Sequence, residues 1–369
     1  MIGIPEAFSP TYAVARRKFL EAAAAGGLEV ESHTHPLAGR DGEVLAMDAA
    51  LDGPRGADKL LMVSSACHGV EGYCGSGVQV FALHDAEWRA KARDAGVAVL
   101  YIHALNPYGF SHIRRVTQEN VDLNRNFHDF AQPLPVNTAY REIAELVLPA
   151  TWPPDAANQQ QVQQFVAERG LPVWQAAVSG GQHEYPDGLF YGGQAPTWSN
   201  QTLRQLLAAY AARAQDVAWI DLHTGLGPSG VGERIWAGGH DDVAIARARR
   251  WWGDQVTSIY DGSSTSALLT GLMWGAIHDA APQAEYTGIA LEYGTEPIME
   301  VLDALRGDQW LAQHPEAPPE LAASIKARLL KAFYTDTDTD AWKGQVVSQA
   351  RQAMFQAVDG LRTDSAPAA

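Results

Sequence analysis

His68 and Glu71 stand three residues apart in the run His68-Gly69-Val70-Glu71 and form a compact pair of side chains of the kind that bind zinc. They follow directly after an apolar stretch at residues 60–63. The imidazole offers one nitrogen and the carboxylate one or two oxygens, whereas a catalytic zinc takes three protein ligands and leaves one position open. The pair therefore predicts a third ligand elsewhere in the chain, together with a general base and groups that hold a substrate.

His223 is the best candidate for the third ligand. It follows the short apolar run at residues 217–220, and Asp221 stands two residues before it. A ligating histidine is usually held by a carboxylate or a carbonyl on its other ring nitrogen, and Asp221 is close enough to be considered. Strand alternation could equally place both side chains on the same face without contact. A single histidine after a strand is more often structural, but the His68/Glu71 pair favours a metal-binding role.

Glu292 closes the apolar run at residues 288–291. A carboxylate is costly to bury unless it has a partner, so one interpretation is a salt bridge or an exit into solvent. The other is a general base that takes a proton from a water molecule activated by the metal.

A third group of polar residues spans 114–127 and is dense in hydrogen-bond donors, with Arg114, Arg115, Asn124 and Arg125 among them. Arginine binds carboxylates through two parallel hydrogen bonds, and asparagine can add a neutral donor. An arginine near the metal could stabilise an oxyanion. Taken alone, the segment is more simply a surface loop with ion pairs among its charged residues.

The elements that must position these residues are predicted from apolar periodicity. Buried strands are expected at residues 59–65, 97–104, 217–222 and 288–291, two further strands at 28–35 and 43–51, and helices at 12–25, 78–95 and 202–214. This alternation predicts a mainly parallel sheet covered by helices. Each of the four buried strands is followed at once by polar residues. Ligands bind beyond the carboxyl ends of such strands, so the pattern predicts one shared site.

Composition limits the possible functions. The 369 residues show no repeat and no flexible linker, so we expect a single domain over residues 1–362, with 150–200 an excursion near the active site and 363–369 a disordered tail. The formal net charge of −16 argues against nucleic acid or an anionic membrane as partner. No apolar run is long enough for a transmembrane span. The chain has only two cysteines, Cys67 and Cys74, which suits a reducing cytoplasm.

These motifs together resemble the zinc carboxypeptidase superfamily, the M14 metallopeptidases. The matching residues are His68-x-x-Glu71, the stretch Asp122-Leu123-Asn124-Arg125-Asn126-Phe127, His223 after a strand, and Glu292 near the end of the core, in the order of that family. The branch that the chain resembles most is DUF2817, because of the segments Asn106-Pro107-Tyr108-Gly109-Phe110 and Pro196-Thr197-Trp198-Ser199-Asn200. The expected fold is a single α/β domain with a mixed, mostly parallel twisted sheet flanked by helices.

The resemblance implies a role for each matching residue. His68, Glu71 and His223 would bind one zinc ion per chain, and Glu292 would be the general base. Asn124 and Arg125 would hold a substrate carboxylate, whereas Arg114 or Arg115 would polarise the scissile carbonyl, with Arg115 preferred for that role and Arg114 near the substrate. The family also uses a tyrosine before the base, for which Tyr260 and Tyr286 are candidates that fit poorly.

The expected reaction is zinc-dependent hydrolysis of an amide bond next to a free carboxylate. A metallocarboxypeptidase acting on a small peptide is the first choice. The second is a deacylase of N-acyl amino acids, of the aspartoacylase and succinylglutamate desuccinylase type, and the third is a non-catalytic module that binds a metal or a carboxylate. Other candidate sites are weaker: His33-x-His35 lies in an early edge strand, and Trp274 could line a substrate cleft. The oligomeric state is left open.

Overall fold

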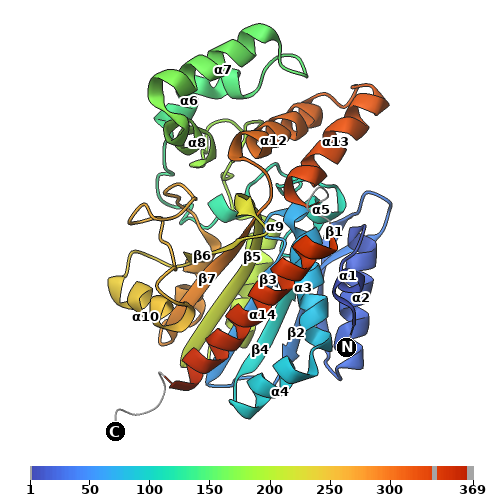
Figure 1. Cartoon of the computed structure of the whole chain (residues 1–369), viewed down its shortest axis with the longest axis vertical. Helices are drawn as coiled ribbons and strands as arrows, with labels where there is room; N and C mark the ends of the chain where they lie inside the picture. The colour runs from blue at the N-terminus through green and yellow to red at the C-terminus, as the bar shows by residue number, and fades with distance from the viewer. Residues whose placement is uncertain (1, 335–338, 364–369) are drawn as a thin grey trace.

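A seven-stranded sheet runs through the centre of the computed structural model, which describes residues 2–334 and 339–363 (Figure 1). The strands lie in the order β1-β2-β4-β3-β5-β7-β6. Their bounds are β1 Val30–Ala38, β2 Val44–Asp52, β3 Lys59–Ser65, β4 Ala98–His103, β5 Asp216–Ser229, β6 Gly232–Trp236 and β7 Glu285–Gly294. The central strands β4, β3, β5 and β7 are parallel, whereas β1 and β2 at one edge and β6 at the other run antiparallel to their neighbours.

The four parallel strands are the four that the apolar runs predict. Their side chains are almost entirely buried, because helices cover the sheet and leave no polar face on these strands. The mixed α/β architecture is thereby confirmed, with the parallel arrangement confined to the centre of the sheet. The edge strand β6 is the addition that the sequence did not predict. It is short, and only the last two of its five residues are buried.

Helices surround the sheet and extend beyond one of its ends. Their bounds are α1 Ile4–Ala7, α2 Tyr12–Ala25, α3 Gly72–His84, α4 Ala86–Asp94, α5 Pro107–Ser111, α6 Thr138–Val147, α7 Ala156–Arg169, α8 Leu171–Ser179, α9 Trp198–Tyr210, α10 Asp242–Trp252, α11 Ala276–Ala280, α12 Ile298–Gln313, α13 Pro319–Phe333 and α14 Asp340–Thr363, with short 3-10 turns η1 Gly69–Glu71, η2 Leu123–Arg125 and η3 Met273–Gly275. α3 packs against β3, α14 packs against β5, and both helices contact each other. α2 packs against α3, and α9 contacts β2.

The single helix expected at residues 78–95 is wrong, because the chain forms two helices there. Asp85 interrupts the helix with an extended backbone, and its side chain accepts a hydrogen bond from the backbone N–H of Trp88. Aspartate competes well for such a cap, so α4 begins afresh at residue 86. The helix predicted at residues 202–214 begins four residues earlier, at Trp198, and ends at Tyr210. Thr197 caps the start of this helix, α9.

The segment at residues 150–200 forms α7, α8 and the start of α9. Together with α6, α12 and α13, α7 and α8 lie beyond the end of the sheet (Figure 1). Of the tail predicted at 363–369, residue 363 ends α14, and residues 364–369 fall outside the described residues. None of the described helices combines the length and apolar character that a bilayer crossing requires.

Candidate metal centre

The loop that carries His68 and Glu71 follows β3 and is fixed by its backbone. The N–H groups of Gly69 and Val70 donate to the carbonyl oxygens of Arg115 and Arg114, at 3.0 and 2.9 Å. A Cβ atom on Gly69 would lie 2.0 Å from the carbonyl carbon of Gly109, so this close approach to α5 requires glycine. The His68/Glu71 loop is therefore held against the segment that contains the two arginines.

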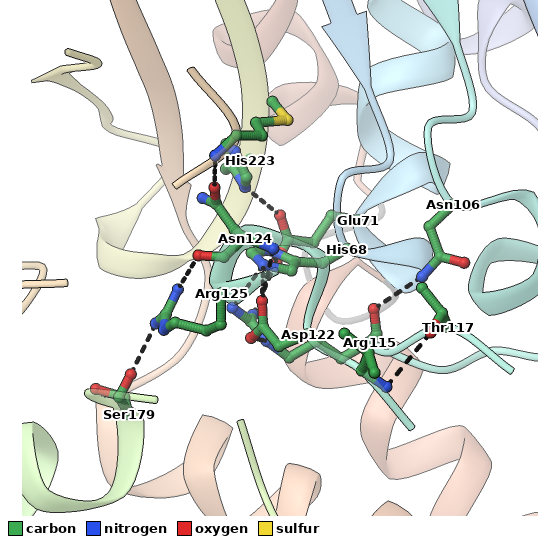
Figure 2. A network of polar contacts seen from close by, with 12 residues as sticks. His68, Glu71, Asn106, Arg115, Thr117, Asp122, Asn124, Arg125, Ser179 and His223 are labelled. Atoms are coloured by element: carbon green, nitrogen blue, oxygen red, sulfur yellow. Dashed lines mark hydrogen bonds and ion pairs between the residues drawn. The ribbon is translucent and has the colours of Figure 1, made fainter. Parts of the chain in front are cut away.

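The three predicted zinc ligands lie together (Figure 2). Nδ1 of His68 is 2.9 Å from Oε1 of Glu71, and Nδ1 of His223 is 2.9 Å from Oε2 of the same carboxylate. Ligand atoms of all three side chains lie within 4.8 Å of one another, and all three residues are buried. Each imidazole thus presents Nδ1 toward the space that a metal ion would share with Glu71.

The outer nitrogen of each imidazole faces a second carboxylate. Nε2 of His68 lies 3.2 Å from Oδ1 of Asp122, and Nε2 of His223 contacts Asp221. Asp221 was considered for this role from the sequence. The sequence motifs give no role to Asp122, although its place two residues before Asn124 in the matching stretch is a signal for one, and in the structure its side chain also accepts from the N–H of Asn124. Such outer carboxylates fix the ring orientation and raise the basicity of the ligating nitrogen.

The donor set and its charge fit a divalent cation. Four carboxyl groups surround or line the site, from Glu71, Asp122, Asp221 and Glu292, whereas two guanidinium groups face them, from Arg115 and Arg125. A bound cation would lie among these carboxyl groups, which outnumber the guanidinium groups. Two imidazole nitrogens and a carboxylate are a donor set that zinc accepts in catalytic sites with one position left open.

A second set of donors, Cys67 with Asp221 and His223, also comes within 4.8 Å. Burial raises the pKa of the Cys67 thiol, and the carboxylates of Asp221, Asp122 and Glu71 raise it further. Because thiolate is the form that binds metals, the set containing Glu71 is favoured.

The ionisation of the ligand cluster follows from its contacts. Burial acts to raise the pKa of Glu71, but the two imidazoles outweigh it and hold the pKa below its ordinary value. Burial acts to lower the pKa of His223, but Asp221 and Glu71 outweigh it and raise the pKa. Arg115 and His68 likewise keep the pKa of Asp122 well below its usual range against the effect of burial. Glu71 and Asp122 are therefore charged.

Glu292 behaves differently from Glu71. It stands opposite His223 in the β5–β7 register, and its side chain lines the same cavity as the three candidate ligands. Its Oε1 accepts a hydrogen bond of 3.1 Å from the N–H of Leu226, and among the described residues it has no ion-pair partner. Burial, reinforced by the charge of Glu71, raises the pKa of Glu292 to about 8. A carboxyl group in this range can exchange protons near neutral pH.

The two neighbouring arginines point to different places. Arg115 lines the cavity, donates to Asp122 at 2.9 Å and to Glu71 at 3.2 Å, and lies over the ring of Phe190. Arg114 is absent from the cavity lining and pairs instead with Asp308 on α12 at 3.1 Å. The structure thus brings Arg115 to the site and leaves Arg114 outside it, away from the substrate position expected from the sequence.

Arg125 is a buried cation at one side of the cavity. Its Nη1 and Nη2 donate to the carbonyl oxygens of Asn124 and Ser179, and its Nε has no hydrogen-bond partner. No carboxylate forms a salt bridge with it in the described part of the chain. Burial lowers the pKa of Arg125. Asn124 lies beside it, with Oδ1 accepting from the N–H of Met273 at 3.0 Å. A buried guanidinium without a salt bridge is a natural site for an anionic group of a ligand.

The candidate tyrosines are engaged elsewhere. The hydroxyl of Tyr260 donates to the carbonyl of Gly238, and that of Tyr286 donates to Ala237. In the part of the chain that the structure describes, tyrosine is absent from the cavity lining, whereas Trp274 is present with an unpartnered indole N–H.

The histidines of the early edge strand take no part in the site. His33 pairs with Glu31, and His35 packs on Trp198. Neither belongs to a group of metal-binding side chains in the described ranges.

The family model described as "Protein of unknown function (DUF2817)" matches residues 8–349, which is nearly the whole chain. The chain belongs to the DUF2817 family. This confirms the branch that the sequence motifs indicated. No curated protein matches the chain.

The DUF2817 chain is also similar to several solved structures. Carboxypeptidase A from Helicoverpa armigera has 12% sequence identity and a TM-score of 0.45, covering 90% of this chain and 76% of that one. Bovine thrombin-activatable fibrinolysis inhibitor, solved with tick carboxypeptidase inhibitor, has 8% identity and a TM-score of 0.49, covering 97% and 98%. A metallo-carboxypeptidase from Burkholderia cenocepacia has 11% identity and a TM-score of 0.37, covering 86% and 66%. Matches this distant assign no substrate.

Proposed function

We propose that this chain is a zinc-dependent hydrolase that cleaves an amide bond next to a free carboxylate, most simply a metallocarboxypeptidase. One observation carries the proposal. Three side chains that could hold a metal ion, a buried carboxyl group with a raised pKa and a buried arginine without a salt bridge all line one cavity. Each is expensive to bury alone, and together they supply what hydrolysis of such an amide requires.

His68, Glu71 and His223 would hold the zinc ion. When bound, zinc polarises a carbonyl oxygen and lowers the pKa of a water molecule. Glu292, which lines the same cavity as the three ligands, would take the proton from the attacking water and deliver it to the leaving nitrogen. Arg115, beside Glu71, can donate to the negative charge that develops on the carbonyl oxygen.

Arg125 would bind the substrate carboxylate, with Asn124 beside it. The guanidinium fork matches a carboxylate in a bidentate geometry, and the buried position excludes competing water. The same recognition serves a peptide C-terminus and an N-acyl amino acid, because both carry the carboxylate next to the scissile amide.

The proposal includes the cell compartment. Cys67 and Cys74 are free, buried thiols, which suits a reducing compartment such as the cytoplasm.

The test is an assay of purified protein, loaded with zinc or stripped by a chelator, on a mixed library of peptides and N-acyl amino acids. We expect the zinc-loaded protein to hydrolyse substrates and the stripped protein to be inactive. Only compounds that carry a free carboxylate next to the amide should be hydrolysed. Tight binding of such compounds without hydrolysis would favour the non-catalytic module. Turnover that survives removal of the metal would refute the zinc mechanism.

A further inference from the structure

One face of α12 lines the cavity with apolar side chains only. Ile298, Val301, Leu302 and Leu305 recur at helical spacing, and all four contribute to the lining. Phe333, from the end of α13, completes this surface, which we call the α12 wall. Within the described ranges α12 and α13 place no charged side chain on the cavity.

The α12 wall stands on the Glu71 side of the metal cluster. α13 packs against η1, which contains Glu71, and α12 and α13 both pack against β5. A Cβ atom at Gly225, two residues after His223, would come within 2.8 Å of the ring of Phe333. This contact places Phe333 directly beside the strand that carries a metal ligand.

A different apolar set lines another part of the cavity, which also contains Arg125, the arginine that would bind the carboxylate. It consists of Ile235, Ile259, Leu269, Leu272, Trp274 and Ala290. The segment at residues 271–273 is joined to the arginine's neighbours, because the N–H of Met273 donates to Asn124 and the carbonyl of Gly271 accepts from Phe127, both at 3.0 Å. The part of this set around residue 272 is therefore joined to Asn124 beside Arg125, whereas the helices of the α12 wall pack against η1 and β5.

The α12 wall is held in place by partly buried ion pairs. Asp308 on α12 contacts Arg114 at 3.1 Å and Lys326 on α13 at 2.5 Å. Lys326 also donates to the carbonyl of Ile113 at 2.9 Å. Both helices are thereby tied to the loop that carries Arg115, so the wall is formed before a substrate binds.

We infer that the α12 wall is the binding site for the acyl side of the scissile amide, and that it selects an apolar, uncharged group there. The inference rests on the proposed function. With the substrate carboxylate on Arg125, the side chain next to that carboxylate meets the set around Leu269, and the group across the amide meets the α12 wall. The substrate is then an amide that joins an apolar acyl group to an amino acid. A charged group on the acyl side would lose hydration without gaining a partner on the wall.

The experiment compares kcat/KM for leucine acylated with acetyl, butanoyl, hexanoyl and octanoyl groups. Two dipeptide-like compounds accompany them: leucyl-leucine, which has a free amine, and its N-acetylated form. We expect kcat/KM to rise about threefold to fourfold per added methylene until the wall is covered, as burial of one methylene predicts. N-acetyl-leucyl-leucine should be hydrolysed faster than leucyl-leucine. Equal rates across the acyl series would overturn the inference and leave the proposed function standing.

Single substitutions show which residues set the acyl preference. Leu302→Ala should shift the highest kcat/KM to a longer acyl group, because the smaller side chain leaves more space at the wall. Leu302→Met, which nearly keeps the volume of leucine, should retain the preference of the wild type. The matched control is Leu269→Ala, which should change selection of the amino-acid side chain and leave the acyl preference unchanged. An acyl preference that follows Leu269 in place of Leu302 would refute the assignment of the wall.

Binding separates this inference from the proposed function. Calorimetry with zinc-loaded Glu292→Gln protein measures Kd for the same acyl series, whether or not the wild type turns it over. Tighter binding with longer acyl groups, without any hydrolysis by the wild type, would remove the proposed function and keep the inference. Constant Kd along the series would refute the inference.

Discussion

Nδ1 of His223 lies 2.9 Å from Oε2 of Glu71, although 152 residues separate the two in the chain. The other oxygen of Glu71 faces Nδ1 of His68 at the same distance. One carboxylate therefore sits between two imidazoles whose Nδ1 atoms both face inward. This arrangement orders the cluster before a metal ion binds, and the first two predictions follow from it.

Removal of either imidazole should abolish stoichiometric zinc binding. His68→Ala and His223→Ala each leave two ligands, which is fewer than a catalytic zinc site uses. Metal analysis of purified protein should show about one zinc per chain in the wild type and well below that in both variants. His33→Ala, a histidine with a carboxylate partner away from the site, is the matched control and should keep its zinc. Full occupancy in either ligand variant would refute the assignment.

Asp221→Asn should weaken zinc binding about tenfold to a hundredfold, because the outer carboxylate orients His223 and raises its basicity. The side chain keeps its size, so the fold should persist. Competition with a chromophoric chelator measures the change in Kd. Asp216→Asn, at the start of the same strand, is the control. Unchanged affinity in the Asp221 variant would show that the contact does not support the ligand.

Glu292→Gln should keep the metal and lose at least about a hundredfold in kcat, the lower end of general-base effects. The amide matches the carboxyl group in size but cannot accept the proton. Glu285→Gln, at the exposed start of the same strand, is the control and should leave kcat unchanged. Near-normal turnover by the Glu292 variant would mean that another group activates the water.

Arg125→Lys should lose carboxylate recognition although its charge is kept, because an ammonium group cannot reproduce the guanidinium fork. For the wild type, converting one hydrolysed substrate from free acid to carboxamide should cost several kcal/mol, since it leaves a buried cation without its partner. Arg114→Lys should retain this discrimination and instead lower stability, because Arg114 pairs with Asp308. Equal kcat/KM for acid and carboxamide would refute carboxylate recognition.

Stability should fall in mild acid because of His103. This side chain is fully buried, faces Oγ of Ser76 at 2.9 Å and stacks on Phe19, and burial lowers its pKa to about 4. The unfolded chain binds a proton below about pH 6.5 and the folded chain does so only below about pH 4, so stability decreases as pH falls through this range. The full effect is about 3 kcal/mol.

Denaturant unfolding of the wild type and of His103→Asn between pH 7 and pH 4 measures that contribution. The variant should be less stable at pH 7 but show a shallower loss toward pH 4. Parallel pH profiles for the two proteins would show that His103 does not carry the effect.

The sequence by itself determined the central strands and the types of the site residues. Buried parallel strands need apolar runs, and ligand-binding side chains follow the carboxyl ends of such strands. Both features can therefore be recognised from short segments of the sequence. His68, Glu71, His223 and Glu292 could be selected for this reason. The edge strand β6 and the break at Asp85 escaped prediction, because a short, partly exposed strand and a single cap leave weak patterns.

Tertiary structure shows why only one of two adjacent arginines enters the site. The sequence favours Arg115 over Arg114 but gives no physical reason for the choice, whereas in the structure Gly69 and Val70 hold the backbone of both residues and only Arg115 lines the cavity. The role of Asp122 likewise depends on contact with His68, 54 residues away. The α12 wall exists only because two helices fold back over the end of the sheet. Such relationships depend on packing between distant segments, which local sequence patterns do not encode.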